Sequence, residues 1–130
     1  MLTSLTYISR PKIDAGSTDI QDVWMHALEK NERLEISGAL YFDGTSVVQY
    51  LEGEEAPLHD LFGQIKADPR HEDVEILGEA DLASRLFSTW PLKLIDGSRS
   101  THLQGIFDYD TLIEASRNQI NKLAFRLRRL

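Results

Sequence analysis

Apolar residues recur along this chain with two periods, about 2 and about 3.6 residues, and the period predicts the element. Alternating positions over residues 2–9 predict a first strand. A helix follows, with Ser17 or Thr18 as its N-cap and with Thr18 and Gln21 spaced as a capping box. This helix is expected to run to about Asn31. Its apolar stripe consists of Ile20, Val23, Trp24, Ala27 and Leu28.

Two further apolar runs, residues 34–42 and 46–52, flank the pair Asp43-Gly44. An Asp-Gly pair between apolar runs predicts a β-hairpin. A second helix is expected over residues 55–67, where Asp68-Pro69 would end it. The buried stripe of this helix consists of Leu58, Leu61, Phe62 and Ile65.

The remaining chain predicts two more strands and a helical segment. A fourth strand should begin at Val74, and a fifth should cover residues 85–95, where Pro91 requires an edge or bulged position. Helical spacing over residues 108–128 predicts one helix or two.

The order β-α-β-β-α-β-β predicts an α+β, ferredoxin-like sheet with two helices on one face, followed by a C-terminal helix or helix pair. We expect residues 1–97 to form the main domain and residues 98–130 a helical extension that packs on the sheet.

Charge and composition exclude several classes of function. The 130 residues carry a formal net charge of −7, which disfavours direct binding to nucleic acid. The exception is Lys122–Leu130, which has four basic residues and no acidic one. It is either a docking surface or, the interpretation we favour, a helix end whose dipole attracts cations. No stretch approaches the roughly 18 apolar residues of a membrane span, and no signal peptide is expected at the N-terminus.

The residue inventory also limits the chemistry. The chain has no cysteine, which excludes disulfides and thiolate metal sites and is compatible with a reducing cytoplasm. No glycine-rich phosphate loop and no nucleophile elbow are present. A zinc site is not expected, because the four histidines lack ligand spacing. They are His26, His59, His71 and His102.

Gln49 is unusual, because it is a primary amide in the strand-like run Val47–Leu51. A buried amide without a partner costs about 1–3 kcal/mol, so Gln49 either faces solvent or bonds something specific. Strands one and three are adjacent in a ferredoxin-like sheet, so Tyr7 and Gln49 can face one slot, with Asn31 at its end. A phenol and two carboxamides would recognise a heterocycle with an imide edge. Each residue alone is also compatible with a polar group that is simply paired.

Several segments together resemble the BLUF family, flavin-based sensors of blue light. The match runs in order over about residues 2–95. Its segments are Tyr7-Ile8-Ser9, Asn31 followed by Ile36-Ser37-Gly38-Ala39-Leu40, Gln49-Tyr50-Leu51-Glu52-Gly53, Ile65 with Asp68-Pro69-Arg70-His71, and Arg85-Leu86-Phe87 with Trp90.

The resemblance implies that FAD is held non-covalently between the two helices. Asn31 would bond the imide edge of the flavin, and Gln49 would sit between Tyr7 and the flavin N5/O4 side. On excitation, Tyr7 would give an electron and a proton to the flavin, with Gln49 relaying the proton and ending rotated or tautomerised. Absorption would then move slightly to the red, and no substrate would be turned over, so no enzyme is expected. The resemblance also implies that Val23 and Ile65 sandwich the ring and that Asp68, Arg70 and His71 line the pocket.

One position departs from the family pattern. Leu92 stands where the family commonly has methionine, two residues after Trp90. Leucine keeps the volume but lacks the thioether acceptor. Trp90 is therefore a candidate for transmitting the signal beside Gln49, with a plain core tryptophan as the alternative.

We expect a short, stand-alone photoreceptor that signals through an unidentified partner protein or by self-association, as a homo-oligomer. One alternative is a ferredoxin-like interaction domain that has lost its flavin. A small hydrolase of the acylphosphatase type is disfavoured, because no arginine-bearing phosphate loop is present.

Overall fold

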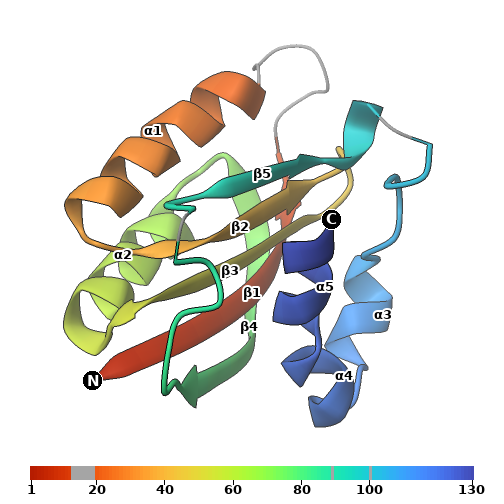
Figure 1. The fold of residues 1–130 in the computed structure, drawn as a ribbon. Coiled ribbons are helices and arrows are strands. Elements are labelled where there is room, and N and C mark those ends of the chain that lie inside the picture. Colours follow the sequence, from red (N-terminus) through yellow and green to blue (C-terminus); the bar gives the residue numbers. More distant parts are fainter. Residues whose placement is uncertain (13–19, 89, 100) are drawn as a thin grey trace.

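The computed structural model describes residues 1–12, 20–88, 90–99 and 101–130, and its fold is a five-stranded sheet with helices on both faces (Figure 1). The sheet order is β4-β1-β3-β2-β5, with β2 and β5 parallel and the other neighbours antiparallel. The strands are β1 (Leu2–Pro11), β2 (Ser37–Phe42), β3 (Val47–Glu54), β4 (His71–Asp81) and β5 (Lys93–Asp96). The helices are α1 (Ile20–Arg33), α2 (Glu55–Ala67), α3 (Tyr109–Ile113), α4 (Arg117–Asn121) and α5 (Leu123–Arg129), with a 3-10 turn over Gly97–Arg99.

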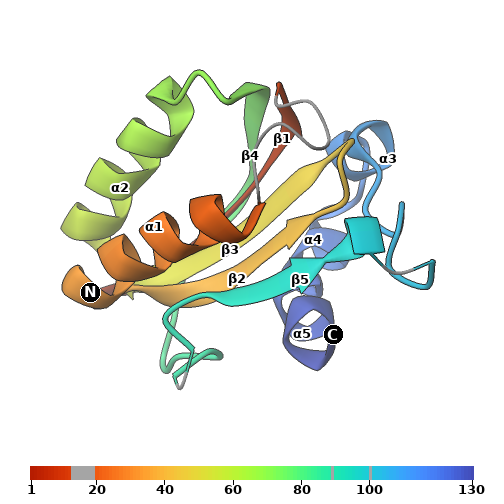
Figure 2. The same cartoon turned by 90° about the horizontal axis from the view of Figure 1, so that it is seen from above.

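Helices α1 and α2 cover one face of the sheet, as Figure 2 shows from above. On this face a buried cluster joins β1, β3 and α2, and its members include Leu5, Tyr7, Leu51, Leu58 and Leu61. The ferredoxin-like arrangement is thereby confirmed, and β1 and β3 are the adjacent strands that the prediction required.

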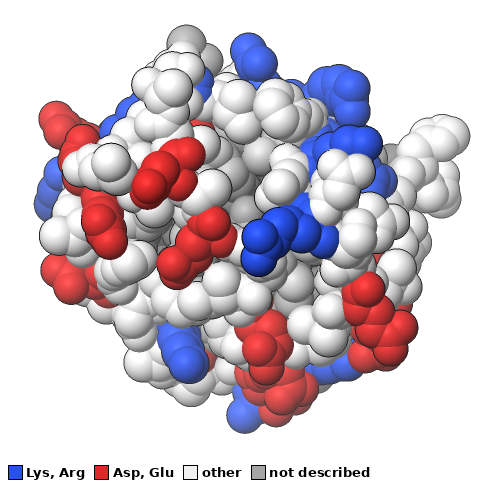
Figure 3. Space-filling view, turned by 90° about the horizontal axis from the view of Figure 1, so that it is seen from below, with Lys and Arg blue, Asp and Glu red and all other residues white. Residues whose placement is uncertain are grey.

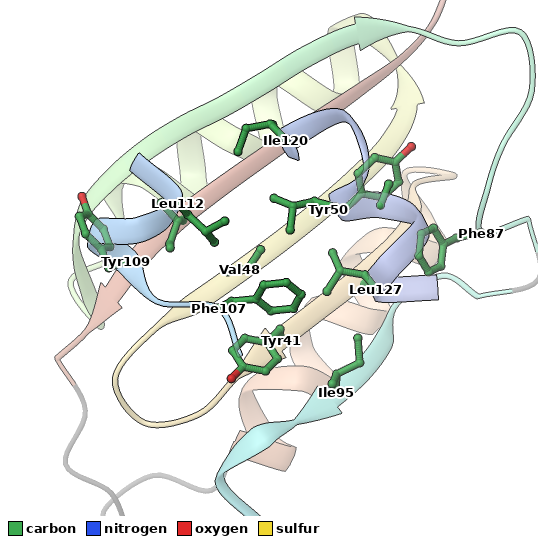
Figure 4. Packing of buried hydrophobic residues seen from close by; sticks show 14 residues of the cluster. Tyr41, Val48, Tyr50, Phe87, Ile95, Phe107, Tyr109, Leu112, Ile120 and Leu127 are labelled. Atoms are coloured by element: carbon green, nitrogen blue, oxygen red, sulfur yellow. The ribbon is translucent and has the colours of Figure 1, made fainter. Parts of the chain in front are cut away.

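The opposite face of the sheet is covered by α3, α4 and α5 (Figure 4). Because side chains alternate along a strand, Val48 and Tyr50 point to this side while Gln49 points to the other. The cluster that they form with the C-terminal helices includes Tyr41, Phe87, Phe107, Leu112, Ile120, Leu123 and Leu127. The expected C-terminal helical region is present, divided into three short helices.

The hairpin between β2 and β3 turns where the Asp-Gly pair predicted. Asp43 Oδ1 accepts the backbone N–H groups of Thr45 and Ser46, at 2.9 and 2.8 Å. Its Oδ2 accepts the Tyr41 hydroxyl at 2.7 Å and the Gly105 N–H at 3.0 Å. One buried carboxylate thus ties the hairpin to the segment that leads into α3.

The predicted fifth strand over residues 85–95 is wrong in extent, because β5 covers only Lys93–Asp96. Residues Leu86 and Phe87 instead donate their backbone N–H groups to the Glu52 carboxylate, at 2.9 and 2.8 Å. Pro91 has no N–H to give a ladder. The fourth strand begins at His71, three residues before the predicted Val74. The predicted capping box at Thr18 lies outside the described residues.

Candidate functional site

The site is built around a hydrogen bond between the two central strands. Tyr7 and Gln49 are direct cross-strand partners of β1 and β3. The Tyr7 hydroxyl donates to Gln49 Oε1 at 2.5 Å, and both side chains are buried. A phenol hydroxyl that donates to an amide needs the amide oxygen as its acceptor. This bond therefore turns the oxygen of Gln49, and not its nitrogen, toward Tyr7.

Tyr7 lies against the second helix. Its ring centroid is 5.7 Å from that of Phe62 on α2 and 6.2 Å from that of His71 at the start of β4. Burial raises the pKa of the Tyr7 phenol well above its usual value, and the nearby Asp68 charge raises it further. Tyr7 is therefore a neutral phenol with a transferable proton over the whole physiological range.

Two amide groups retain unused hydrogen-bonding capacity. Gln49 Nε2 and Asn31 Oδ1 have no hydrogen-bond partner among the residues that the structure describes. Both residues are buried, Gln49 on β3 and Asn31 in the last turn of α1. These two atoms are not among the fully enclosed, unpaired side-chain atoms of the described residues. They therefore remain accessible to a ligand that could complete their hydrogen bonding. This donor and acceptor match the carbonyl and imide N–H edge of a flavin.

Asn31 already has one partner at its other end. Its Nδ2 donates to the Pro91 carbonyl at 2.8 Å. The neighbouring carbonyls of Trp90 and Leu92 accept from Gly38 N at 3.2 Å and from Trp24 Nε1 at 2.9 Å. Residues 90–92, which belong to no helix or strand, are therefore held by β2 and α1.

The two candidate signalling residues differ in burial. Leu92 is buried, at 2% exposure, whereas Trp90 is 40% exposed. Trp90 is thus not a core tryptophan, and that alternative is wrong. Its ring lies 6.1 Å from the buried Phe87 ring and 5.0 Å from Lys93 Nζ, which also donates to the Arg128 carbonyl of α5.

The three polar residues after α2 are occupied by protein groups. Asp68 accepts from Arg70 through its backbone N–H at 2.9 Å and through its guanidinium at 2.6 Å. The bond from Arg70 lowers the pKa of the Asp68 carboxyl, against the opposing effect of burial. His71 contacts the Ser9 hydroxyl at 2.8 Å through Nδ1 and the Ile65 carbonyl at 2.5 Å through Nε2. His71 therefore ties β1 to the end of α2.

Two apolar residues complete the predicted set. Ile65 packs against the buried cluster on the face of the sheet that α1 and α2 cover. Val23 is half-buried on α1. The two therefore come from the two helices that cover one face of the sheet, as a sandwich of a planar ring requires.

Comparison with known proteins decides the family. Residues 2–93 match the family described as BLUF, sensors of blue-light using FAD. The chain belongs to the BLUF family. It is 34% identical over 92 residues to the photoactivated adenylate cyclase subunit beta of Euglena longa, covering 70% of this chain and 11% of that protein. It is 33% identical over 115 residues to the blue light- and temperature-regulated antirepressor BluF of Escherichia coli K12, covering 85% of this chain and 28% of that protein.

A solved BLUF structure matches almost the whole chain. The dark-state structure of the BLUF protein BlrB is 26% identical with a TM-score of 0.81, and the match covers 98% of this chain and 96% of that one. The chain spans only a small part of the curated relatives, so the activities of those longer proteins do not transfer to it directly. Members of the BLUF family bind flavin and respond to blue light.

Sequence reasoning missed several residues around this BLUF site. Trp24 was assigned only to the apolar stripe of α1, although a half-buried indole N–H needs an acceptor. Phe62 was likewise assigned only to a buried stripe, and Ser9 was given no role beyond its place in the first strand and in the family segment Tyr7-Ile8-Ser9. No local signal identified Glu52 as the acceptor for a loop 34 residues away.

Two further features bear on the excluded classes. Within the described residues, no helix combines the length and the apolar composition needed to cross a membrane. Over the same part of the chain, no three acidic or histidine side chains are grouped so that they could hold a metal ion.

Proposed function

We propose that this protein is a blue-light photoreceptor that holds FAD non-covalently between α1 and α2, with Tyr7 and Gln49 as its light-dependent switch. The observation that carries the proposal is the Tyr7 to Gln49 hydrogen bond beside an amide N–H₂ that has no partner among the described residues. The BLUF match supports it, because that family is defined by blue-light sensing with FAD.

The chain's own residues fit the flavin edge. Asn31 Oδ1 would accept from the flavin imide, and Gln49 Nε2 would donate on the N5/O4 side. Val23 and Ile65 would pack on the two faces of the ring. Asp68, Arg70 and His71 would line the side nearest α2, held in place by the contacts described above.

A bound flavin that has absorbed blue light supplies an oxidant strong enough to accept an electron from a phenol. Tyr7 gives up this electron together with its hydroxyl proton, which passes to Gln49 across their hydrogen bond. Both return to Tyr7 on recombination, so nothing is consumed. Gln49 is left rotated or tautomerised, which exchanges its donor and acceptor ends. Because the amide is enclosed and has two discrete arrangements, it acts as a two-state switch.

The change at Gln49 then has to be transmitted from the sheet to a partner molecule. We propose residues 1–97 as the flavin-binding domain and residues 98–130 as a helical extension that carries the output to an unidentified signalling protein or to a second copy in a homo-oligomer. The outer side of α5 exposes Phe125 and three arginines, Arg126, Arg128 and Arg129. On the face seen in Figure 3, several basic side chains gather at the upper right, and most acidic side chains lie at the left and at the lower right. In this proposal, signalling involves no catalytic turnover and no direct contact with nucleic acid or a membrane. A cytoplasmic location is compatible with the absence of cysteine.

Purified protein tests the proposal. We expect yellow protein with flavin absorption bands, release of FAD on denaturation when analysed by chromatography, and a reversible red shift under blue light. Released FMN in place of FAD would correct the cofactor. Protein that stays colourless after incubation with FAD would instead indicate the flavin-free interaction domain.

A further inference from the structure

Residues 90–92 are positioned by three hydrogen bonds to consecutive carbonyl groups. The donors are Gly38 N to Trp90 at 3.2 Å, Asn31 Nδ2 to Pro91 at 2.8 Å, and Trp24 Nε1 to Leu92 at 2.9 Å. The segment has no ladder or helix of its own. Its position therefore depends on these donors and on the Trp90 N–H, which donates to the Phe87 carbonyl at 3.0 Å.

Two of the three donors are side chains of α1. Trp24 and Asn31 are seven residues apart, which is two helical turns, so they lie on the same face of the helix. They reach across 68 and 60 residues of sequence, respectively. Helix α1 thus holds the segment at two successive peptide groups.

The two side-chain donors differ in their relation to the proposed flavin. Asn31 uses its amide nitrogen on Pro91 and has its oxygen available for the ligand. Trp24 has a single donor and no acceptor, and that donor is used on Leu92. Among the side chains of α1 that the structure describes, Trp24 is therefore the donor that holds the segment without also serving the ligand.

A shift of residues 90–92 would break the hydrogen bond between Trp24 and the Leu92 carbonyl. Leu92 is buried while Trp90, two residues earlier, is 40% exposed. Sliding the segment to exchange the two side chains would move the Leu92 carbonyl away from α1. A half-buried indole N–H would then be left without an acceptor, which disfavours the exchanged arrangement.

We propose that Trp24 is a positioning residue of the light switch, whose indole N–H holds the Leu92 carbonyl in the resting state and so keeps Leu92 buried and Trp90 exposed. This inference rests on the proposed photoreceptor function for its kinetic consequence only. The bond is broken in the illuminated state and re-forms during dark recovery. Its loss removes part of the driving force for recovery.

Trp24→Phe tests this, because phenylalanine keeps a ring at the position and removes only the donor. We expect dark recovery to slow about two- to fivefold, the effect of losing one ordinary hydrogen bond. Met25→Leu, at an exposed neighbour on α1, is the matched control and should recover at the wild-type rate. An unchanged rate in Trp24→Phe would contradict the proposal.

A second measurement does not depend on light. The chain has two tryptophans, so its ¹H–¹⁵N spectrum contains two indole signals. In dark protein the Trp24 indole should exchange with D₂O at least about tenfold more slowly than that of Trp90, and Trp24→Phe should shift the Trp90 signal. Equal exchange of the two indoles, or an unmoved Trp90 signal, would overturn the inference even if the protein proved not to respond to light.

Discussion

Glu52 accepts the backbone N–H of Phe87 at 2.8 Å, so the strand that carries Gln49 also holds the segment that leads to Trp90. The Glu52 carboxylate is fully buried and accepts four hydrogen bonds. The other donors are Leu86 N, the Ser37 hydroxyl and the Tyr50 hydroxyl. Arg85 supports the arrangement by donating to the Ser37 hydroxyl and to the Glu52 carbonyl. Glu52 and Gln49 lie on opposite faces of β3, and the Glu52 side chain holds the connection between β4 and β5 at Leu86 and Phe87.

Glu52→Gln should destabilise the fold by about 2–4 kcal/mol, because its amide N–H₂ would face donors instead of acceptors. Urea denaturation measures the free energy of unfolding. Glu54→Gln is the control, because Glu54 forms an exposed pair with the N-terminal amine, and it should cost less than about 1 kcal/mol. Equal losses in the two variants would show that the four bonds to Glu52 contribute little.

Tyr7→Phe and Gln49→Leu should each retain bound flavin and abolish the light-induced red shift, because each removes one partner of the 2.5 Å hydrogen bond. Difference absorption spectra before and after blue light measure this. Tyr109→Phe is the matched control, since that hydroxyl bonds the Asp73 carbonyl outside the site, and its shift should be normal. A photocycle that survives in Gln49→Leu would refute the assigned role.

Leu92→Met should change the dark-recovery rate while flavin stays bound. The exchange conserves volume, so the expected loss of stability is below about 1.5 kcal/mol, but it adds a thioether acceptor near the segment held by α1. Recovery followed by absorbance is the measurement, with Leu112→Met on α3 as a buried control. If both variants recover like the wild type, Leu92 contributes packing alone.

Asp43 should contribute acid-sensitive stability. Burial opposes its ionisation, but the bonds from Tyr41, Thr45 and Ser46 outweigh burial and hold the pKa of Asp43 below its usual 3.8. The carboxylate therefore stabilises the fold above the unfolded-state pKa, and this contribution is lost as pH falls through the folded-state pKa. At pH 7, Asp43→Asn should cost about 1–3 kcal/mol.

Urea midpoints measured from pH 7 down to pH 2.5 test the Asp43 prediction. The gap between wild type and Asp43→Asn should narrow once the pH falls below about 3.8. Asp60→Asn, at an exposed position of α2, should follow the wild type throughout. A gap that stays constant across this range would mean that the charge of Asp43 does not contribute.

Gly38→Ala and Gly63→Ala should have opposite signs. A Cβ at Gly38 would lie 1.9 Å from the Tyr50 carbonyl oxygen, a backbone atom that cannot move away, so a loss of about 3 kcal/mol or more is expected. Gly63 lies within α2 and its Cβ would meet no atom within 4 Å, so alanine there should add about 0.5–1 kcal/mol. Thermal unfolding of the pair gives both values, and a tolerated Gly38→Ala would refute the close approach.

The alternating and helical patterns, read locally, determined most of the fold of this protein. The period of each element fixes which of its side chains share a face, so the two helices on one face and the neighbouring strands β1 and β3 followed from the order of elements. Gln49 stood out for the same reason, because an amide in an apolar strand needs a partner. The sequence by itself also carried the family motifs that imply a flavin.

Only the tertiary structure decided the connection between β4 and β5. Its conformation depends on Glu52, Asn31 and Trp24, which lie 34–68 residues away in sequence, so no local period encodes it. These contacts replaced a long predicted strand with a short one, exposed Trp90 and buried Leu92. They also explain Trp24, whose ring follows the helical period while its N–H serves a carbonyl that only the folded chain brings near.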